Sequence, residues 1–224
     1  MTKEMLKAIL IDLDDTLYPS TYYSNLAREN AIKNMIKEGL NSSIYKAKKE
    51  LNNIIEKYGS NYLFHFDRLI EKIEKNATYK EKIIAAGIMA YHKTKQKIKT
   101  FKNVKKTLSF LKKRYRLYLV SEGLKKKQWE KILRLGIKKY FDGFFITEKK
   151  SISFYKKVLK ELKLTPQEVL LIGDHPIKDL SYAKKASIRI IKVYNKKYLG
   201  KDFNNSDKKN VIKNFADILK ILKR

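Results

Sequence analysis

The sequence predicts an α/β fold: a doubly wound parallel β-sheet forms the core, and an all-helical segment is inserted after the first strand. Two observations support this fold class. Short apolar runs alternate with amphipathic helical patterns in the C-terminal half, which is typical of a parallel sheet. The first apolar run stands near the N-terminus and is followed by a long stretch in which no strand is expected.

The expected strands are continuous apolar runs without polar alternation, the pattern of strands buried on both faces of a sheet. They cover residues 7–13, 115–120, 143–146, 169–172 and 188–193. The helical patterns among them cover residues 104–113, 126–135, 154–162 and 179–186. Residues 195–210 are polar and are expected to form an exposed loop, followed by an edge strand at Val211 and Ile212 and a helix over 215–222.

The helical insertion consists of four amphipathic patterns separated by cap and turn residues. They cover residues 23–38, 43–58, 62–75 and 79–93. Asn41 and Ser42 separate the first pair, and Gly59-Ser60-Asn61 separates the next. We therefore expect a Rossmann-like core made of residues 1–16 and 101–224, and a helical domain made of residues 17–100.

Composition excludes several classes of protein. The chain has 224 residues, 43% of them hydrophobic, which is enough for a full core. It has no cysteine, so a disulfide framework, a thiol nucleophile and a cysteine metal site are excluded. The N-terminal apolar run is too short to span a membrane and has no signal-peptide pattern, so we expect a cytoplasmic protein with no membrane partner.

The formal net charge of +29 allows two interpretations. A basic surface attracts phosphates, so the protein could bind nucleic acid or act on it. Alternatively, abundant Lys, Ile, Asn and Tyr with few Gly and Pro reflect the codon drift of an AT-rich genome. The lysines are dispersed over helix surfaces instead of being gathered in one tail, which favours drift.

Polar residues stand where the expected strands end, and in parallel α/β sheets ligands bind beyond those carboxyl ends. The first strand ends at Asp12 and Asp14, and the second ends at Ser121. Lys149 and Lys150 follow the third strand. The fourth is followed by the acids Asp174 and Asp179.

These residue types fit phosphoryl transfer with a metal ion. Clustered carboxylates repel one another unless a divalent cation offsets the repulsion, and an all-oxygen ligand set suits Mg²⁺. Asp12 would attack phosphorus to give an aspartyl phosphate, and Asp14 would serve as general acid and then general base. The Ser121 hydroxyl and a lysine ammonium would hold the phosphoryl oxygens.

The order of these residues resembles the haloacid dehalogenase-like hydrolase superfamily. Its first motif, DxDxT, stands here as Asp12-Leu13-Asp14-Asp15-Thr16, and its second is Ser121 in LYLVSEG. Its fourth, GDxxxxD, is GDHPIKD at residues 173–179. The resemblance implies a Mg²⁺ site of Asp12, the Asp14 carbonyl and Asp174, oriented by Asp179.

The resemblance also implies the residues that bind the substrate phosphate. Thr16, Ser121 and Glu122 belong to this expected set. The third motif of the family is a lysine, often in the pattern KPxPxxF. Tyr155 stands at the place of the Phe in this pattern, and counting back from it selects Lys149 as the motif lysine, with Lys150 as the alternative.

The helical insertion resembles the C1 cap of subfamily I, and the stretches DDTLYPS, YGSNYLFHFD and KQWEKILRLG resemble an archaeal branch described as glyceraldehyde 3-phosphate phosphatase-like. This implies a small phosphorylated metabolite as substrate. A nucleotide or nucleic-acid-end phosphatase, or a nucleic-acid binding protein, is the alternative. A dehalogenase on the same fold is less consistent with the sequence. Dehalogenases of this family need no metal, and they lack an acid at the position of Asp14. The oligomeric state is open.

Overall fold

The computed structural model describes residues 6–76, 78–195 and 210–222. The chain divides into two compact units. The first consists of Met1–Pro19 with Lys99–Arg224, and the second of Ser20–Ile98. The domain assignment made from the sequence stays a prediction, but both units contain the kinds of element expected of them.

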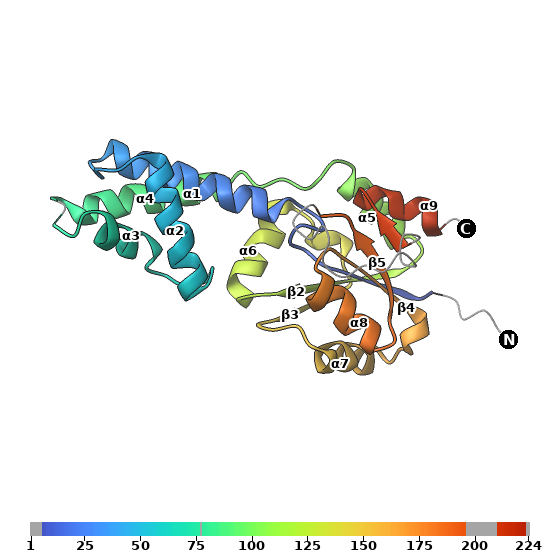
Figure 1. Ribbon diagram of the computed structural model, residues 1–224. Helices are drawn as coiled ribbons and strands as arrows, with labels where there is room; N and C mark the ends of the chain where they lie inside the picture. Colours follow the sequence, from blue (N-terminus) through green and yellow to red (C-terminus); the bar gives the residue numbers. More distant parts are fainter. Residues whose placement is uncertain (1–5, 77, 196–209, 223–224) are drawn as a thin grey trace. The chain divides into compact units, whose positions relative to one another are not determined.

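The first unit is built on a parallel β-sheet (Figure 1). Its strands among the described residues are β1 (Ala8–Ile11), β2 (Arg116–Glu122), β3 (Gly143–Thr147), β4 (Val169–Gly173), β5 (Arg189–Val193) and β6 (Val211–Ile212). They lie in the order β3-β2-β1-β4-β5-β6, and each neighbouring pair is parallel. The predicted doubly wound α/β fold is confirmed.

The position of β1 determines where a ligand can bind. It pairs with β2 on one side and β4 on the other, so the chain changes winding direction at this strand. All four of its residues are fully buried, as expected of a strand covered on both faces. The crevice beyond its carboxyl end is the usual ligand site in such a sheet.

Helices cover the two faces of the sheet. They are α5 (Val104–Lys112), α6 (Lys125–Leu135), α7 (Ile152–Leu162), α8 (Tyr182–Lys185) and α9 (Ile218–Leu222). In Figure 1, α7 and α8 lie on one side of the strands, and α5, α6 and α9 lie on the other. Ala8 and Leu10 pack with Tyr155 and Val158 of α7. Successive side chains of a strand point to opposite faces of the sheet, so these two residues of β1 face the same helix layer.

The helix expected over residues 179–186 differs from the prediction. A π-helical turn, Pro176–Ser181, precedes the short α8. The N–H groups of both Asp179 and Leu180 bond to the carbonyl of His175, which widens this turn. Such π-turns are frequent at functional sites. Most of the loop expected over 195–210 lies outside the described residues, whereas the edge strand after it is present as β6.

A short 3₁₀ turn also replaces the start of the expected C-terminal helix. It covers Phe215–Asp217 and leads into α9. The Asp217 carboxylate accepts the Asn214 N–H, which closes the turn before the helix begins.

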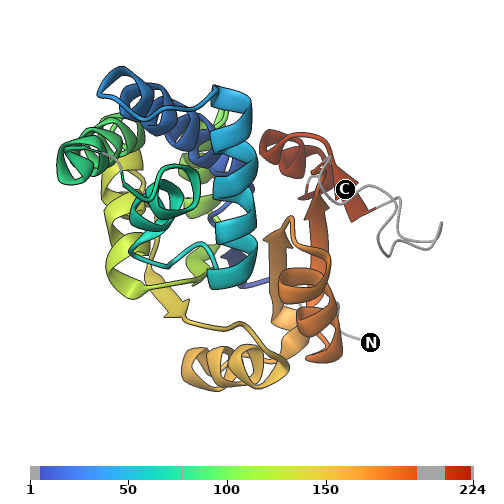
Figure 2. The same cartoon turned by 60° about the vertical axis from the view of Figure 1, so that its left-hand side comes forward.

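The second unit is all-helical. Its helices are α1 (Ser20–Lys37), α2 (Ile44–Tyr58), α3 (His65–Ile73) and α4 (Lys80–Lys95). α1 and α4 run side by side (Figure 1, Figure 2). Gly87 permits this approach, because a Cβ there would lie 2.8 Å from Met35 of α1. A partly buried hydrogen bond from Asn30 to Thr94 also joins the two helices.

Among the described residues, no helix is long and apolar enough to cross a membrane.

Candidate active site

The segment after β1 is a tight, hydrogen-bonded turn. The Asp12 N–H donates to the Ile172 carbonyl at 2.9 Å, which ties the end of β1 to β4. The Asp15 N–H donates to Tyr18, and the Leu17 N–H donates to Leu13. Asp15 has a φ of 57°, a conformation that Asp tolerates better than most residues. The backbone that carries the expected nucleophile is therefore well fixed.

Three acids predicted from the sequence lie together at the ends of β1 and β4. Asp12, Asp174 and Asp179 each offer a carboxylate oxygen, and these atoms all lie within 4.8 Å of one another. The three residues are at most 5% exposed. Within the part of the chain that the structure describes, this is a buried acidic triad that could hold a metal ion.

Close packing places Asp179 in this triad. A Cβ at Gly173 would lie 2.8 Å from the Cβ and Cγ of Asp179, so only glycine leaves room for the acid. The His175 N–H donates to Asp179 Oδ2 at 3.1 Å, and the Tyr155 hydroxyl lies 3.4 Å from Asp179 Oδ1. Asp174 in turn accepts a hydrogen bond from Asn195 at 2.7 Å.

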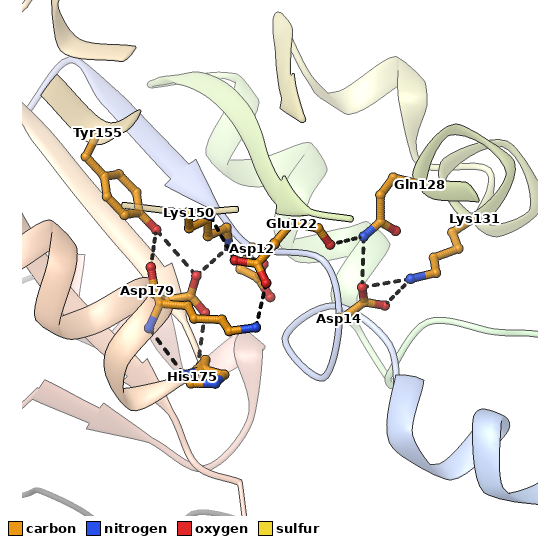
Figure 3. Close-up of polar contacts among 10 residues, drawn as sticks. Asp12, Asp14, Glu122, Gln128, Lys131, Lys150, Tyr155, His175 and Asp179 are labelled. Atoms are coloured by element: carbon orange, nitrogen blue, oxygen red, sulfur yellow. Dashed lines mark hydrogen bonds and ion pairs between the residues drawn. The ribbon is translucent and has the colours of Figure 1, made fainter. Parts of the chain in front are cut away.

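The lysine that reaches the triad is Lys150, the alternative to Lys149, and which of the two binds phosphate stays a prediction. Lys150 is 2% exposed, and its Nζ lies 2.6 Å from Asp12 Oδ1 and 2.5 Å from Asp179 Oδ1 (Figure 3). Lys149 is exposed in a small turn, where its N–H bonds to the Thr147 hydroxyl. Ser151 caps α7 directly after Lys150, so the interval from lysine to Tyr155 is one residue shorter than the motif spacing assumes.

The electrostatics of the cluster reflect the burial of several like charges. Burial raises the pKa of Asp12 well above its ordinary value, and Asp179 and Asp174 raise it further. Burial and the neighbouring Asp179 raise the pKa of Asp174 to about 7. Burial opposes the charged form of Lys150, but Asp12 and Asp179 outweigh it and raise its pKa. A divalent cation would relieve the repulsion among the acids, so these residues fit a metal ion.

Two hydroxyl groups expected at the phosphate site are buried without a hydrogen-bond partner among the described residues. They are Thr16 Oγ1 and Ser121 Oγ, and both residues are fully buried. A buried hydroxyl that makes no hydrogen bond is costly, so a ligand that bonds to it is stabilised. Ser121 lies at the end of β2, next to β1 in the sheet. Both hydroxyls therefore fit a bound polar ligand such as a phosphate.

The side chain of Glu122 does not fit its expected role in phosphate binding. Its Oε2 accepts the Lys150 N–H at 2.8 Å, and its Oε1 pairs with Lys178 Nζ at 2.5 Å. Partial burial disfavours its charge, but these two hydrogen bonds hold its pKa below the ordinary value. An ionised carboxylate donates no hydrogen bond and repels phosphate. The Glu122 side chain instead ties the end of β2 to the loops before α7 and α8, and a place for this residue in the phosphate site stays a prediction.

Asp14 faces a different group of residues from Asp12. Figure 3 shows its side chain directed toward Gln128 and Lys131 of α6 and away from the cluster around Lys150. Lys131 Nζ lies 2.8 Å and 2.7 Å from the two carboxylate oxygens. Tyr18 donates to Oδ1 at 2.7 Å. The side chain is thus outside the triad, and a contact of Asp14 with a metal remains an expectation for its carbonyl alone.

Several residues of the site were not predicted from the sequence. They are Gln128, Lys131, Lys178 and Asn195, each bound to a predicted acid. Of these residues, Gln128 could have been found from the sequence. It is a polar residue at helical spacing from Ile132 and Leu135, on the buried face of α6. A polar residue in such a position commonly bonds to a specific partner.

Comparisons with known proteins agree on one family. A family model described as haloacid dehalogenase-like hydrolase matches residues 9–193. A Methanocaldococcus jannaschii protein named glyceraldehyde 3-phosphate phosphatase is 37% identical, over 98% of this chain and 100% of its own length. The protein of that name from Pyrococcus furiosus is 34% identical, over 98% of this chain and 94% of its own.

A solved structure supports the fold. The putative beta-phosphoglucomutase of Thermotoga maritima matches with a TM-score of 0.69 and 21% identity, over 97% of this chain and 99% of that one. At this identity the likeness bears on the fold alone.

A parallel α/β sheet with buried acids at the ends of two adjacent strands defines a class of hydrolases that work through carboxylates. The chain belongs to the haloacid dehalogenase-like hydrolase family, as its motifs implied. Within that family it is a phosphoric monoester hydrolase.

Proposed function

We propose that this protein is a Mg²⁺-dependent phosphatase in which Asp12 is the nucleophile and Asp14 is the general acid and base. The buried triad of Asp12, Asp174 and Asp179 is the observation that carries the proposal, together with the ammonium group of Lys150 held against two of the acids. The substrate is a small phosphorylated metabolite, and glyceraldehyde 3-phosphate is the specific candidate.

The first chemical step transfers the phosphoryl group to the protein. An Asp12 carboxylate oxygen forms a bond to phosphorus while the bond from phosphorus to the leaving oxygen breaks. Asp14 gives a proton to that oxygen, so the product departs as a neutral alcohol. The hydroxyls of Thr16 and Ser121 and the ammonium of Lys150 hold the phosphoryl oxygens as charge shifts during the transfer.

The second step restores the free protein. Water attacks the phosphorus of the aspartyl phosphate, the bond to Asp12 breaks, and inorganic phosphate is released. Asp14, now ionised, takes a proton from the attacking water. One residue thus serves as acid and then as base, so its carboxylate must stay close to both the leaving oxygen and the water.

The metal site would be formed by Asp12, Asp174 and the Asp14 carbonyl, with Asp179 orienting the other groups. When bound, Mg²⁺ offsets the negative charge of the phosphate and of the acids. Oxygen ligands are consistent with Mg²⁺, which prefers carboxylates, carbonyls and water over nitrogen. Asn195 and the His175 N–H orient the carboxylates of Asp174 and Asp179.

The substrate candidate is supported by the relatives. The proteins from M. jannaschii and P. furiosus align over nearly all of this chain and are both named glyceraldehyde 3-phosphate phosphatase. The net charge of +29 is consistent with a range of anionic substrates and selects none of them. A cytoplasmic location stays a prediction made from the sequence.

The test of the chemistry is release of phosphate from p-nitrophenyl phosphate. We expect activity with Mg²⁺, loss of activity with EDTA, and no activity in Asp12→Asn, which keeps the size of the side chain but removes the nucleophile. Asp15→Asn is a matched control, because Asp15 lies in the same turn and has no proposed chemical role. Full activity of Asp12→Asn would contradict the nucleophile assignment.

The test of the substrate is a comparison of kcat/KM among phosphorylated compounds. Glyceraldehyde 3-phosphate should exceed phosphoglycolate, nucleoside monophosphates and a 5′-phosphorylated oligonucleotide. A higher value for the oligonucleotide, together with binding that weakens steeply with salt, would instead favour a phosphatase of nucleic-acid ends.

A further inference from the structure

We infer that Tyr155 is a positioning residue: its hydroxyl holds the π-helical turn Pro176–Ser181 in place and thereby sets the position of Asp179 beside the metal site. This inference rests on the proposed function and deepens it. Tyr155 belongs to α7, whereas Asp179 belongs to the turn that follows β4. One hydroxyl therefore joins two segments of the site that are 24 positions apart in the chain.

The core of the first unit fixes the ring of Tyr155. This residue is fully buried and belongs to the same hydrophobic cluster as Ala8 and Leu10 of β1 and Leu171 of β4. A side chain in such a close-packed interior has little freedom to move. The sheet thus holds the hydroxyl at a defined point, from which it reaches the turn.

The hydroxyl meets the turn where its backbone departs from α-helical hydrogen bonding. In an α-helix the Tyr182 N–H would bond to the Lys178 carbonyl, four residues earlier. Here this N–H bonds to the carbonyls of Ile177 and Asp179 instead. The Tyr155 hydroxyl donates to the Lys178 carbonyl at 3.1 Å. A side chain of α7 thus takes the place of the regular backbone donor, which stabilises the irregular turn.

The same hydroxyl also approaches the carboxylate of Asp179. It lies 3.4 Å from Oδ1, the oxygen that Lys150 Nζ contacts, while Oδ2 accepts the His175 N–H (Figure 3). A hydroxyl has one proton to donate, so the shorter bond to the Lys178 carbonyl is the main one. Tyr155 therefore acts on Asp179 chiefly through the backbone of the turn that carries it.

The hydroxyl remains a donor because it keeps its proton. Burial raises the pKa of Tyr155 above its ordinary value, and this effect outweighs the nearby charge of Lys150, which lowers it. The family motif has Phe at this position, and Phe would fill the same space without the hydroxyl. The contact with the turn is thus a feature of this chain, and removal of the hydroxyl should leave the fold intact.

The experiment begins with Tyr155→Phe, which removes the hydroxyl and keeps the ring. Tyr118→Phe is the matched control, because Tyr118 lies in the same hydrophobic cluster and its hydroxyl makes no hydrogen bond within the described residues. Amide hydrogen exchange in EDTA, read by mass spectrometry of peptides, reports the state of the turn without metal. We expect exchange in the peptide over Pro176–Ser181 to become about 2- to 10-fold faster in Tyr155→Phe, the effect of losing one hydrogen bond on a local opening.

The affinity for Mg²⁺ tests the consequence for Asp179. Isothermal titration calorimetry measures it on the folded protein, so a loss of global stability alone would not change it. We expect Tyr155→Phe to raise the Kd by about 3- to 10-fold, less than the factor of about 10 to 100 that loss of a direct partner of a metal ligand causes. At saturating Mg²⁺, kcat on p-nitrophenyl phosphate should return close to the wild-type value. Tyr118→Phe should bind Mg²⁺ as the wild type does.

Wild-type Mg²⁺ affinity in Tyr155→Phe, or wild-type exchange of its turn, would overturn the inference. Faster exchange spread evenly over the first unit, or an equal loss of affinity in Tyr118→Phe, would overturn it too, because both indicate general destabilisation. These results would leave the phosphatase function intact. A wild type that neither binds Mg²⁺ nor releases phosphate would instead refute the proposed function, and the positioning role with it.

Discussion

Lys150 Nζ lies 2.6 Å from Asp12 Oδ1, although the two residues are separated by 138 positions in the chain. The same ammonium also contacts Asp179, so one cation is shared by two of the three buried acids. This sharing offsets part of their repulsion.

Replacement of Lys150 should abolish most of the activity, and replacement of Lys149 should not. We expect Lys150→Met to reduce kcat on p-nitrophenyl phosphate by about 10²–10³-fold, the usual cost of losing one group that stabilises developing charge. Lys149→Met is the matched control, because this lysine is its neighbour in sequence but is exposed. The opposite ranking of the two variants would restore the choice of Lys149.

The metal-free protein should lose stability as the pH rises toward 8. The folded pKa of Asp174 is raised to about 7 from its ordinary value of 3.8, so between these values the folded state binds more protons than the unfolded state. The free energy of unfolding therefore falls as pH increases through this window, and the loss is complete above the folded pKa. Asp12, whose pKa is also raised, acts in the same direction.

Thermal unfolding in EDTA at pH 5.5, 6.5, 7.5 and 8.5 measures this effect, as the difference between wild type and Asp174→Asn. The Tm of the wild type should fall relative to that of Asp174→Asn as the pH rises. Added Mg²⁺ should raise the Tm of the wild type most at high pH, where the acids are ionised. A difference independent of pH would contradict a raised pKa for Asp174.

Gly173→Ala should damage the metal site through packing alone. The new Cβ would lie 2.8 Å from Asp179 Cβ and Cγ, and overpacking of this kind costs about 1–3 kcal/mol. The backbone at this strand residue needs no special conformation, so the loss would come from displacement of Asp179. We expect a lower Tm and a smaller stabilisation by Mg²⁺, measured by thermal unfolding with and without the ion. An unchanged response to Mg²⁺ would show that Asp179 can move without harm to the site.

The sequence predicted the parts of the site that depend on strand ends. Asp12, Ser121 and Asp174 each follow a buried strand, and parallel strands bring their carboxyl ends to one edge. Their convergence needs only parallel strands in one sheet, which the alternation of strands and helices predicts. The helical insertion was predictable because no strand pattern interrupts this stretch and because α2 and α3 are clearly amphipathic.

The sequence could not decide which lysine contacts the acids, because that depends on loop length. Counting residues back from Tyr155 assumes that the chain enters α7 with the family's spacing, but Ser151 caps the helix immediately after Lys150. A shift of one position exchanges a buried side chain for an exposed one. Local hydrogen bonds, here from the Lys150 N–H to Glu122, decide such a choice, and these bonds join segments far apart in sequence.

The partners of Asp14 could not be predicted, because they depend on how α6 packs against the turn after β1. Helical periodicity places Gln128 on the buried face of its helix but does not say which residue it meets. Lys131 resembled the other lysines of a chain rich in them, and its contact with Asp14 follows from tertiary structure alone.

The central position of β1 in the sheet also has a consequence for the order of events during synthesis. The strand that precedes Asp12 leaves the ribosome before its neighbours β2 and β4, which come much later in the chain. Until the segment through Asp179 is made, β1 has an open edge and Asp12 has no Lys150 to bond. Pairing across such long intervals slows folding, and the acidic cluster can form only after the segment through Asp179 has been translated.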